Sequence, residues 1–349
     1  MSLRGRTLPI QVGSVVIGGS EDVVIQSMTN TKTDDSESTL HQMKSLAKEG
    51  AGLIRVAVPD KSAVESLPFL VRESPVPIVA DIHFDYRLAL ESITAGVAKI
   101  RINPGNIGSQ EHVKQILQSA KKHGVAIRIG LNTGSVGRVK NRGRYAMKLL
   151  GEYIDFFEAQ SFHQIVISLK SSDILTTIKM NESCARKYAY PLHLGVTEAG
   201  IGQTAVISSA VGIGALLLKG LGSTLRVSIA GDPLTEIPVC KEILRATGLY
   251  HVGVKLVACP TCGRTQVDIE ALANEVKEKT AHLRESLTIA VMGCVVNGPG
   301  EAQEADFGIC GGKNEGLLFA RGKIVRKVPQ DKLVDHLLVL IAETIGVTK

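Results

Sequence analysis

The segment Ala98–Asn132 reads AKIRINPGNIGSQEHVKQILQSAKKHGVAIRIGLN, and its pattern decides the fold of this chain. Two short runs rich in β-branched residues, Ala98–Ile102 and Ala126–Leu131, flank a stretch with helical patterning and so make one β/α unit. The same alternation recurs from about residue 23 to about residue 245. The eight strands that it predicts are Val23–Met28, Leu53–Val58, Ile78–Ile82, Ala98–Ile102, Ala126–Leu131, Gln164–Leu169, Leu192–Thr197 and Thr224–Ile229.

Eight consecutive β/α units of roughly 25 to 30 residues predict an α/β fold with an N-terminal TIM (β/α)8 barrel, which typically takes about 250 residues. An open doubly wound sheet is the alternative. The intervening stretches are amphipathic, as in Ser36–Glu49, where Leu40 and Met43 fall on one helical face. Ahead of the first strand, Ile10–Ile17 with Gly13 at its turn predicts a small hairpin that closes the bottom of the barrel.

The pattern changes beyond about residue 250, where strands and helices no longer alternate in equal units. Strands are predicted at Val252–Val257 and Leu287–Val291, and helices at about Asp268–Leu283 and Asp331–Ile345. This arrangement predicts a separate α+β domain of about 100 residues. We place the barrel at residues 1–248 and the second domain at residues 249–349.

The composition fits one large domain with a smaller one, because 349 residues with 44% hydrophobic side chains can bury a substantial core. The N-terminus has no apolar run behind a basic head, and the apolar stretch Ala205–Leu218 is interrupted and too short to span a bilayer. We therefore expect a soluble, cytoplasmic protein without a membrane segment. Its six cysteines would stay reduced there and are candidates for metal ligands, a nucleophile or packing.

The net charge of +6 suggests an anionic partner, although the surplus is only 40 basic against 34 acidic residues. Nucleic acid and a phosphorylated substrate would explain this charge equally well. The aromatic content is 4% and tryptophan is absent, so the chain lacks the stacking platforms that single-stranded nucleic acid requires. We expect a phosphorylated small molecule and no nucleic acid.

The predicted strand ends carry cations, and in a TIM barrel the loops at the carboxyl ends of the strands build the active site. A buried cation without a partner is expensive, and arginine matches phosphate oxygens bidentately, so cations on five strands favour a diphosphate or bisphosphate ligand. The alternative is internal pairing with Asp81, Asp155, Glu158, Glu198 or Asp232. The expected substrate-binding residues are Arg55, His83, Arg101, Asn103, Arg128, Asn132, Ser168, Lys170, Arg226 and Ser228.

Two further residues of the barrel mouth are candidates for proton chemistry. Glu198, in the run Thr-Glu-Ala-Gly after the seventh strand, sits where a barrel places a general acid or base. Its alternative role is that of a counter-ion for Lys170. His83 follows Asp81 by two residues, and this carboxylate could orient the imidazole, although a buried or supporting histidine is the more common case.

A cysteine constellation occupies the second domain. Cys259 and Cys262 stand three positions apart in Cys-Pro-Thr-Cys, and Cys294 precedes a glycine-rich loop that brings backbone close to a bulky group. A lone Cys-x-x-Cys equally fits structural zinc or thiol redox chemistry. The fourth ligand is either Cys310 or Glu301, and a carboxylate beside three thiolates would be an exchangeable ligand on an iron–sulfur cluster.

The motifs together resemble a known family. They are CPTCGRT at 259–265, MGCVVNGPGE at 292–301, QSMT at 26–29, DIH at 81–83 and VTEAG at 196–200. With the strand-end residues, they closely resemble the IspG/GcpE family of bacterial 4-hydroxy-3-methylbut-2-enyl diphosphate synthases. The likeness spans essentially the whole chain, without the large central insertion of some relatives.

The resemblance implies a TIM barrel joined to a C-terminal α+β iron–sulfur domain that is similar to sulfite and nitrite reductases. It implies a [4Fe-4S] cluster on Cys259, Cys262, Cys294 and Glu301, with Glu198 handling a proton. The implied substrate is 2-C-methyl-D-erythritol 2,4-cyclodiphosphate, which is opened reductively with loss of water in the non-mevalonate isoprenoid pathway. Electrons would come from reduced flavodoxin or ferredoxin. The implied assembly is a homodimer with its active site between the subunits.

Two other functions remain alternatives at this point. One is a zinc-stabilised module that binds nucleic acid beside a barrel. The other is an aldolase-like barrel with Lys170 as a Schiff-base nucleophile, which would leave the cysteines unused. Either would give a colourless protein, whereas a protein with an iron–sulfur cluster is brown.

Overall fold

We describe a computed structural model of the chain that covers residues 2–103, 106–135, 139–294, 300 and 303–346. The chain divides into two compact units, Met1–Tyr250 and His251–Lys349, here called the barrel unit and the C-terminal unit. Each unit has its own hydrophobic core, and each is described by itself. Within the described residues, no helix has both the length and the apolar character needed to cross a membrane.

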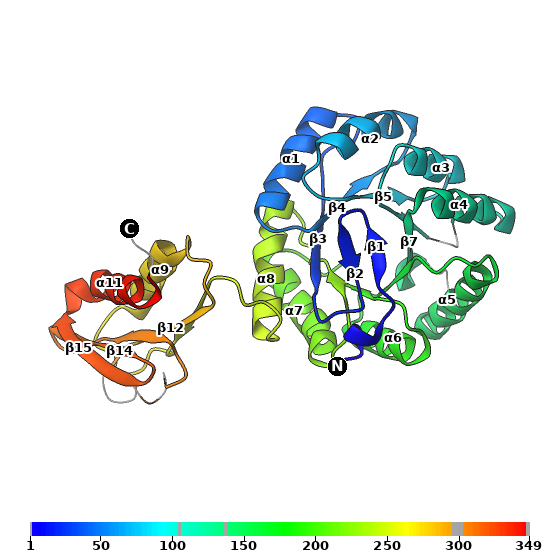
Figure 1. Cartoon of the computed structure of the whole chain (residues 1–349). Helices are drawn as coiled ribbons and strands as arrows, with labels where there is room; N and C mark the ends of the chain where they lie inside the picture. The colour runs from blue at the N-terminus through cyan, green and yellow to red at the C-terminus, as the bar shows by residue number, and fades with distance from the viewer. Residues whose placement is uncertain (1, 104–105, 136–138, 295–299, 301–302, 347–349) are drawn as a thin grey trace. The chain divides into compact units, whose positions relative to one another are not determined.

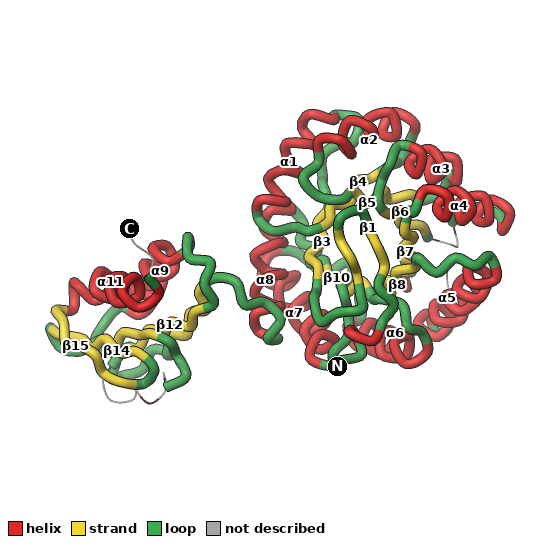
Figure 2. The backbone as a smooth tube through the Cα atoms, in the orientation of Figure 1, coloured by secondary structure: helices red, strands yellow, loops and turns green. Residues whose placement is uncertain are grey.

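The barrel unit is built on a parallel sheet of eight strands in the order β8-β7-β6-β5-β4-β3-β10-β9. A single bridge between Ile167 and Leu192 joins the two ends of this sheet and closes it. Figure 2 shows these strands at the centre of the unit with helices outside them. The TIM barrel predicted from the sequence is confirmed, and the alternative of an open doubly wound sheet is wrong. The strands are β3 (Val24–Met28), β4 (Leu53–Ala57), β5 (Ile78–Ile82), β6 (Lys99–Ile102), β7 (Ala126–Asn132), β8 (Ile165–Lys170), β9 (His193–Leu194) and β10 (Thr224–Leu225).

Helices surround the barrel and bury its outward-facing residues (Figure 1). Carboxylates in the preceding loops start several of them, since Asp60 accepts from the backbone N–H of Ala63 and Asp173 from that of Thr176. The predicted helix near residue 36 is confirmed, and its Met43 is fully buried. The helices are α1 (Ser36–Lys48), α2 (Lys61–Glu73), α3 (Tyr86–Thr94), α4 (Gln110–His123), α5 (Arg142–Ala159), α6 (Ile174–Lys187), α7 (Gly202–Leu218) and α8 (Glu236–Ala246).

The last two barrel strands are shorter than predicted. β9 ends at Leu194, and four residues later the chain passes through Glu198, whose φ of 54° lies in the left-handed region. β10 ends at Leu225, and a little further on the backbone N–H of Ile229 donates to a carboxylate oxygen of Glu236 rather than to a neighbouring strand. The segments after both strands therefore leave the sheet and line its mouth.

The predicted hairpin closes the bottom of the barrel. β1 (Ile10–Val12) pairs antiparallel with β2 (Val15–Ile17), and Gly13 at the turn has a φ of 58°, which favours glycine. A buried cluster joins this hairpin to residues at the amino-terminal ends of four strands. Its members are Ile10, Val12, Ile17, Leu53, Val79, Ala126 and Val166. The opposite, carboxyl end of the barrel is left for the site.

The C-terminal unit contains one five-stranded sheet in the order β11-β12-β13-β14-β15. β11, β12 and β13 are parallel, whereas β14 is antiparallel to both β13 and β15. Helices α9 (Ile269–Thr280) and α11 (Leu333–Ile345) pack on the sheet and bury its apolar residues. Both predicted helices and both predicted strands are present, while the other three strands were not predicted. The strands are β11 (Val254–Ala258), β12 (Leu287–Met292), β13 (Phe307–Cys310), β14 (Glu315–Ala320) and β15 (Lys323–Pro329).

Candidate active site

A cavity of about 120 Å³ lies at the carboxyl end of the barrel strands. It is lined by all of the predicted barrel-mouth residues except His83 and Asn103. Parallel strands bring their carboxyl ends to one edge, which is why side chains far apart in sequence meet here. The lining residues are Arg55, Arg101, Arg128, Gly130, Asn132, Ser168, Lys170, Val196, Thr197, Glu198, Arg226 and Ser228.

Asp81 joins three of the predicted residues. Its carboxylate lies 3.3 Å from Nη2 of Arg55, 3.1 Å from Nη1 of Arg101 and 3.0 Å from Nε2 of His83. Only 3% of the Asp81 side chain is exposed, so burial would raise its pKa, but Arg55, His83 and Arg101 hold that pKa well below its usual range. The carboxylate therefore stays ionised, orients the imidazole and neutralises part of the charge of two arginines.

Arg226 has a different carboxylate partner. Its Nε lies 3.2 Å from Oε2 of Glu236, and its Nη2 lies 3.3 Å from Oε1 of the same residue. Glu236 is buried at the start of α8 and was not among the carboxylates considered as partners. The sulfur of Met28 also accepts from Nη1 of Arg226 at 3.3 Å. Internal ion pairing, the alternative to ligand binding, thus accounts for Arg55, Arg101 and Arg226.

Arg128 and Lys170 are cations of the cavity that do not take part in these ion pairs. They are 2% and 8% exposed, and neither forms an ion pair with another described residue. Nε and Nη1 of Arg128 also lack a hydrogen-bond partner among the described residues. Burial, with the cations nearby, lowers the pKa of Arg128 and that of Lys170 well below their ordinary values. The cavity therefore contains two cationic side chains that no described carboxylate pairs with.

A second polar layer lies deeper in the barrel. Lys99, which precedes Arg101 by two residues on β6, is fully buried and its Nζ has no partner among the described residues. Burial and the charges of Arg128 and Arg55 lower the pKa of Lys99 well below its ordinary value. His193 on β9 is also buried, and its Nδ1 lies 2.5 Å from the hydroxyl of Thr224. Sequence reasoning did not select either Lys99 or His193.

Two glycines make room for the cations. A Cβ atom at Gly130 would lie 2.7 Å from Nε of Arg101, and one at Gly195 would lie 2.5 Å from Nζ of Lys170. Both separations are shorter than side-chain contacts allow. Glycine on β7 and just after β9 therefore leaves space that the side chains of Arg101 and Lys170 occupy, and at Gly195 the backbone oxygen of Arg226 is also only 2.9 Å from the Cβ position. The sequence alone did not point to these two glycines.

Glu198 lines the cavity from an unusual backbone conformation. Its φ of 54° is left-handed, which is uncommon for a residue other than glycine and costs on the order of 1 kcal/mol. Its carboxylate forms no ion pair with Lys170 in the described part of the chain, so the counter-ion alternative is wrong for this structure. Backbone strain of this kind is common at functional positions.

The predicted cluster ligands follow the ends of neighbouring strands in the C-terminal unit. β11 and β12 are paired with Ala258 opposite Val291, so Cys259 and Cys294 leave the sheet at the same edge. The backbone N–H of Gly293 donates to Sγ of Cys259 at 3.2 Å. Cys262 is exposed, and a backbone hydrogen bond from Arg264 lowers its pKa, which favours the thiolate that metals bind.

The described thiols form an incomplete ligand set. Glu301, the predicted fourth ligand, lies outside the described residues, and no three His, Cys, Asp or Glu side chains among those described are gathered closely enough to hold an ion. The donor chemistry still suits an iron–sulfur cluster, because Cys259 and Cys294 follow the ends of two paired parallel strands and Cys262 lies in the loop that begins at Cys259. Cys310 is buried near them, and burial raises its pKa to about 12, in keeping with a packing role.

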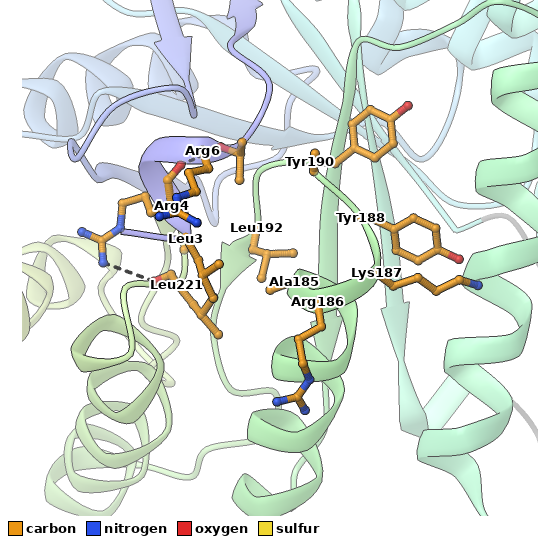
Figure 3. Close-up of a pocket in the computed structure, with 13 residues that line it drawn as sticks. Leu3, Arg4, Arg6, Ala185, Arg186, Lys187, Tyr188, Tyr190, Leu192 and Leu221 are labelled. Atoms are coloured by element: carbon orange, nitrogen blue, oxygen red, sulfur yellow. Dashed lines mark hydrogen bonds between the residues drawn. The ribbon is translucent and has the colours of Figure 1, made fainter. Parts of the chain in front are cut away.

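Larger cavities elsewhere contain none of the predicted substrate-binding residues. One of about 250 Å³ lies near the N-terminus, at the end of the barrel unit that carries the hairpin (Figure 3). There the guanidinium of Arg4 turns to backbone carbonyl oxygens, including that of Leu221 at 3.4 Å, so its hydrogen bonds serve the fold. Another, of about 600 Å³, lies against α9 and α11 and is largely apolar.

Comparison with known protein families covers almost the whole chain. Residues 7–241 match the GcpE TIM-barrel domain, and residues 255–343 match the GcpE protein C-terminal domain. The chain belongs to the GcpE family. The family resemblance and the enzyme class that we drew from the motifs are confirmed, as is the order of a barrel followed by a C-terminal domain. The likeness of that second domain to sulfite and nitrite reductases stays a prediction.

Relatives within the GcpE family are similar over nearly their full lengths. Three of them carry the name 4-hydroxy-3-methylbut-2-en-1-yl diphosphate synthase (flavodoxin) and are each 48% identical to this chain. That of Geobacillus kaustophilus covers 96% of this chain and 91% of its own length. Those of Caldanaerobacter subterraneus and Natranaerobius thermophilus cover 97% and 99% of this chain, with 97% and 98% of their own lengths.

Two solved structures of other proteins align with about two thirds of this chain. Dihydropteroate synthase from Yersinia pestis aligns with a TM-score of 0.53 and 14% identity over 69% of this chain and 99% of its own. The enzyme from Vibrio fischeri aligns with a TM-score of 0.53 and 12% identity over 69% of this chain and 98% of its own. At such identities the match supports the TIM-barrel fold and carries no functional argument.

Proposed function

We propose that this GcpE-family chain reduces 2-C-methyl-D-erythritol 2,4-cyclodiphosphate to 4-hydroxy-3-methylbut-2-enyl diphosphate in the non-mevalonate isoprenoid pathway. The observation that carries the proposal is the pair of buried, unneutralised cations, Arg128 and Lys170, in the barrel-mouth cavity. An anionic diphosphate supplies the charge that these side chains lack. The synthase name that the relatives share supplies the substrate.

Binding is divided among the residues of the cavity. Arg128 and Lys170 receive the diphosphate charge directly, since neither is paired with a described carboxylate. Arg55 and Arg101 are held in place by Asp81 and turn their remaining N–H groups toward the ligand. The polar side chains that complete the proposed substrate contacts are those of His83, Asn103, Asn132, Ser168, Arg226 and Ser228.

Glu198 is the proposed proton donor. The overall reaction consumes two electrons, opens the ring at a carbon–oxygen bond and releases a hydroxyl oxygen as water. Glu198 lines the cavity, whereas His83 lies beside it and contacts Asp81. We therefore assign delivery of the proton on that departing oxygen to the Glu198 carboxyl group, with His83 in a supporting position.

Cys259, Cys262 and Cys294 would hold a [4Fe-4S] cluster, with Glu301 as its fourth ligand. When bound, such a cluster supplies electrons one at a time. The three thiols support this assignment. Cys259 and Cys294 follow the ends of adjacent strands, and the lowered pKa of Cys262 favours its thiolate form. The relatives' name gives flavodoxin as the donor that we propose here, with ferredoxin as the alternative.

The proposal includes a cytoplasmic homodimer in which the cluster of one subunit serves the barrel of the other. A reducing compartment keeps the free thiols available for iron, which supports the location. The assembly rests on the family resemblance and has a direct test. Mixing a Cys262→Ser subunit with a Lys170→Met subunit restores turnover if one active site uses both chains, and leaves the mixture inactive if each chain works alone.

Cluster binding and turnover test the function together. Anaerobically prepared protein is expected to be brown, with broad absorbance near roughly 400 nm, and to convert the cyclodiphosphate with dithionite as reductant. Cys262→Ser should lose both colour and turnover. Cys310→Ala is the matched control and should keep both, because Cys310 is a buried packing thiol. A colourless zinc protein, or equal losses in the two variants, would contradict the proposal.

A further inference from the structure

The edge strand β15 has an unusual composition. It is the last strand of the C-terminal sheet, so one side of its backbone has no neighbouring strand among the described residues. Its sequence KIVRKVP contains three exposed cations, Lys323, Arg326 and Lys327, and no carboxylate. None of the three forms an ion pair with another described residue. Their charge is therefore available to a partner.

Two aliphatic residues lie between these cations on the surface. Ile324 is 57% exposed and Val325 is 48% exposed. Val325 is the extra residue of a β-bulge, because Phe319 pairs with Ile324 while the preceding Leu318 pairs with Arg326. Lysines and a bulge on an edge strand also protect it from pairing with other strands. Such protection does not require adjacent exposed Ile and Val, whereas a docking site with an apolar centre and a charged rim does.

The strand lies close to the proposed cluster ligands across the sheet. Lys327 pairs with Leu317, Leu317 with Cys310, and Cys310 with Met292, which stands two residues before Cys294. Three strand spacings separate β15 from β12, a distance of about 14 Å. A partner on β15 would therefore be positioned near the cluster without covering its ligands.

We propose that β15 is the docking surface for a protein electron donor with an acidic face. The inference rests on the proposed function, because only a reductive enzyme needs such a donor. A second copy of this chain is a poor occupant, since antiparallel pairing of two β15 strands would bring cations opposite cations. Complementary charge would speed encounter with an acidic donor and orient it over Ile324 and Val325.

Charge reversal on the full-length, cluster-loaded protein tests the surface. The variant carries Lys323→Glu, Arg326→Glu and Lys327→Glu. The matched control carries Lys121→Glu, Lys122→Glu and Lys277→Glu, which reverse three exposed cations on α4 and α9. Affinity for purified flavodoxin is measured by titration, and turnover is measured with flavodoxin and with dithionite.

The β15 variant is expected to bind flavodoxin roughly tenfold more weakly and to show a matching rise in KM for flavodoxin. In high salt, the β15 variant and the unmodified protein should differ less in their affinity for flavodoxin and in their KM for it. Turnover driven by dithionite should be the same in both proteins. Equal affinity in the β15 and control variants would overturn the inference, as would a β15 variant that only loses self-association. If the unmodified protein fails with dithionite as well, the proposed function fails, while the titration still decides the docking surface.

Discussion

Replacing Arg128 with methionine should stabilise the barrel unit while weakening its ligand binding. Arg128 is 2% exposed, has no ion pair among the described residues and lies near the charges of Arg55 and Arg101. Methionine keeps much of the volume and removes a buried charge that has no ion-pair partner among the described residues. Replacing buried ion pairs with apolar side chains can stabilise by about 1 to 4 kcal/mol, and we take about 2 kcal/mol for the removal of the single unpaired charge of Arg128.

Arg226→Met is the matched comparison, with an effect of the opposite sign. Arg226 is paired with Glu236 at 3.2 Å, so its removal leaves a buried carboxylate without its cation. Breaking a buried pair in this way costs about 3 kcal/mol or more. Since 1 kcal/mol shifts Tm by about 2 to 4 °C in a domain of this size, Arg128→Met should raise Tm by roughly 4 to 8 °C. Arg226→Met should lower it by roughly 6 to 12 °C.

Calorimetric scans of both variants, with and without inorganic pyrophosphate, supply the measurement. Pyrophosphate should raise the Tm of the unmodified protein by binding the folded state, and it should raise that of Arg128→Met much less. The reasoning is refuted if Arg128→Met lowers Tm, or if both variants shift Tm in the same direction. Retention of the full pyrophosphate shift by Arg128→Met would refute its role in binding.

Three further predictions concern the same cavity. Asp81→Asn should lower the free energy of urea unfolding at pH 6 by about 3 kcal/mol. Because the folded pKa of Asp81 is depressed, this stabilisation is present above about pH 4 and is lost as pH falls further, so the difference from the unmodified protein should narrow at pH 3. Burial and nearby cations lower the pKa of Lys170, and only its protonated form attracts an anion. The contribution of Lys170 to pyrophosphate binding should therefore decline as pH rises, so the difference in affinity between the unmodified protein and Lys170→Met should narrow in calorimetric titrations at higher pH. Gly195→Ala should weaken pyrophosphate binding at least about tenfold through its clash with Lys170, whereas Gly214→Ala, which has open space, should not; equal affinities would contradict this.

The barrel could be predicted because its strands have a strong local pattern. In Ala126–Leu131 the isoleucines face the helices while Arg128 faces the barrel interior, so one strand shows both the core and the site. In a TIM barrel the carboxyl ends of the strands meet at one end of the barrel, so the fold itself brings these cations close together. Most of the residues that line the cavity could therefore be predicted from their positions at the strand ends.

The partners of these cations were harder to predict. Glu236 lies ten residues after Arg226, and nothing in its local pattern indicates that a glutamate at a helix start will turn into the barrel. Gly130 and Gly195 matter through close contacts with atoms of residues far away in the sequence, which are the side chains of Arg101 and Lys170 and, for Gly195, the backbone oxygen of Arg226. Such features depend on tertiary packing, which a period-two or helical pattern does not contain.

The missed strands of the C-terminal unit have a similar explanation. β13 is only Phe-Gly-Ile-Cys, with a glycine that accommodates Phe319 from the next strand, and β15 has so little buried surface that it lacks alternation. The cysteine spacing by itself also fitted zinc. The third cysteine and Glu301 favoured a cluster with an exchangeable ligand, and the longer motifs, through the family they resemble, indicated iron and sulfide.

The number of electrons consumed for each product molecule tests the proposed reaction. Reduced flavodoxin is titrated anaerobically into cluster-loaded protein with the cyclodiphosphate, and the allylic diphosphate product is quantified by chromatography. We expect one product molecule for every two electrons delivered, and no product without reductant. Product that forms without reductant, or cyclodiphosphate that stays intact while the flavodoxin is oxidised, would contradict it.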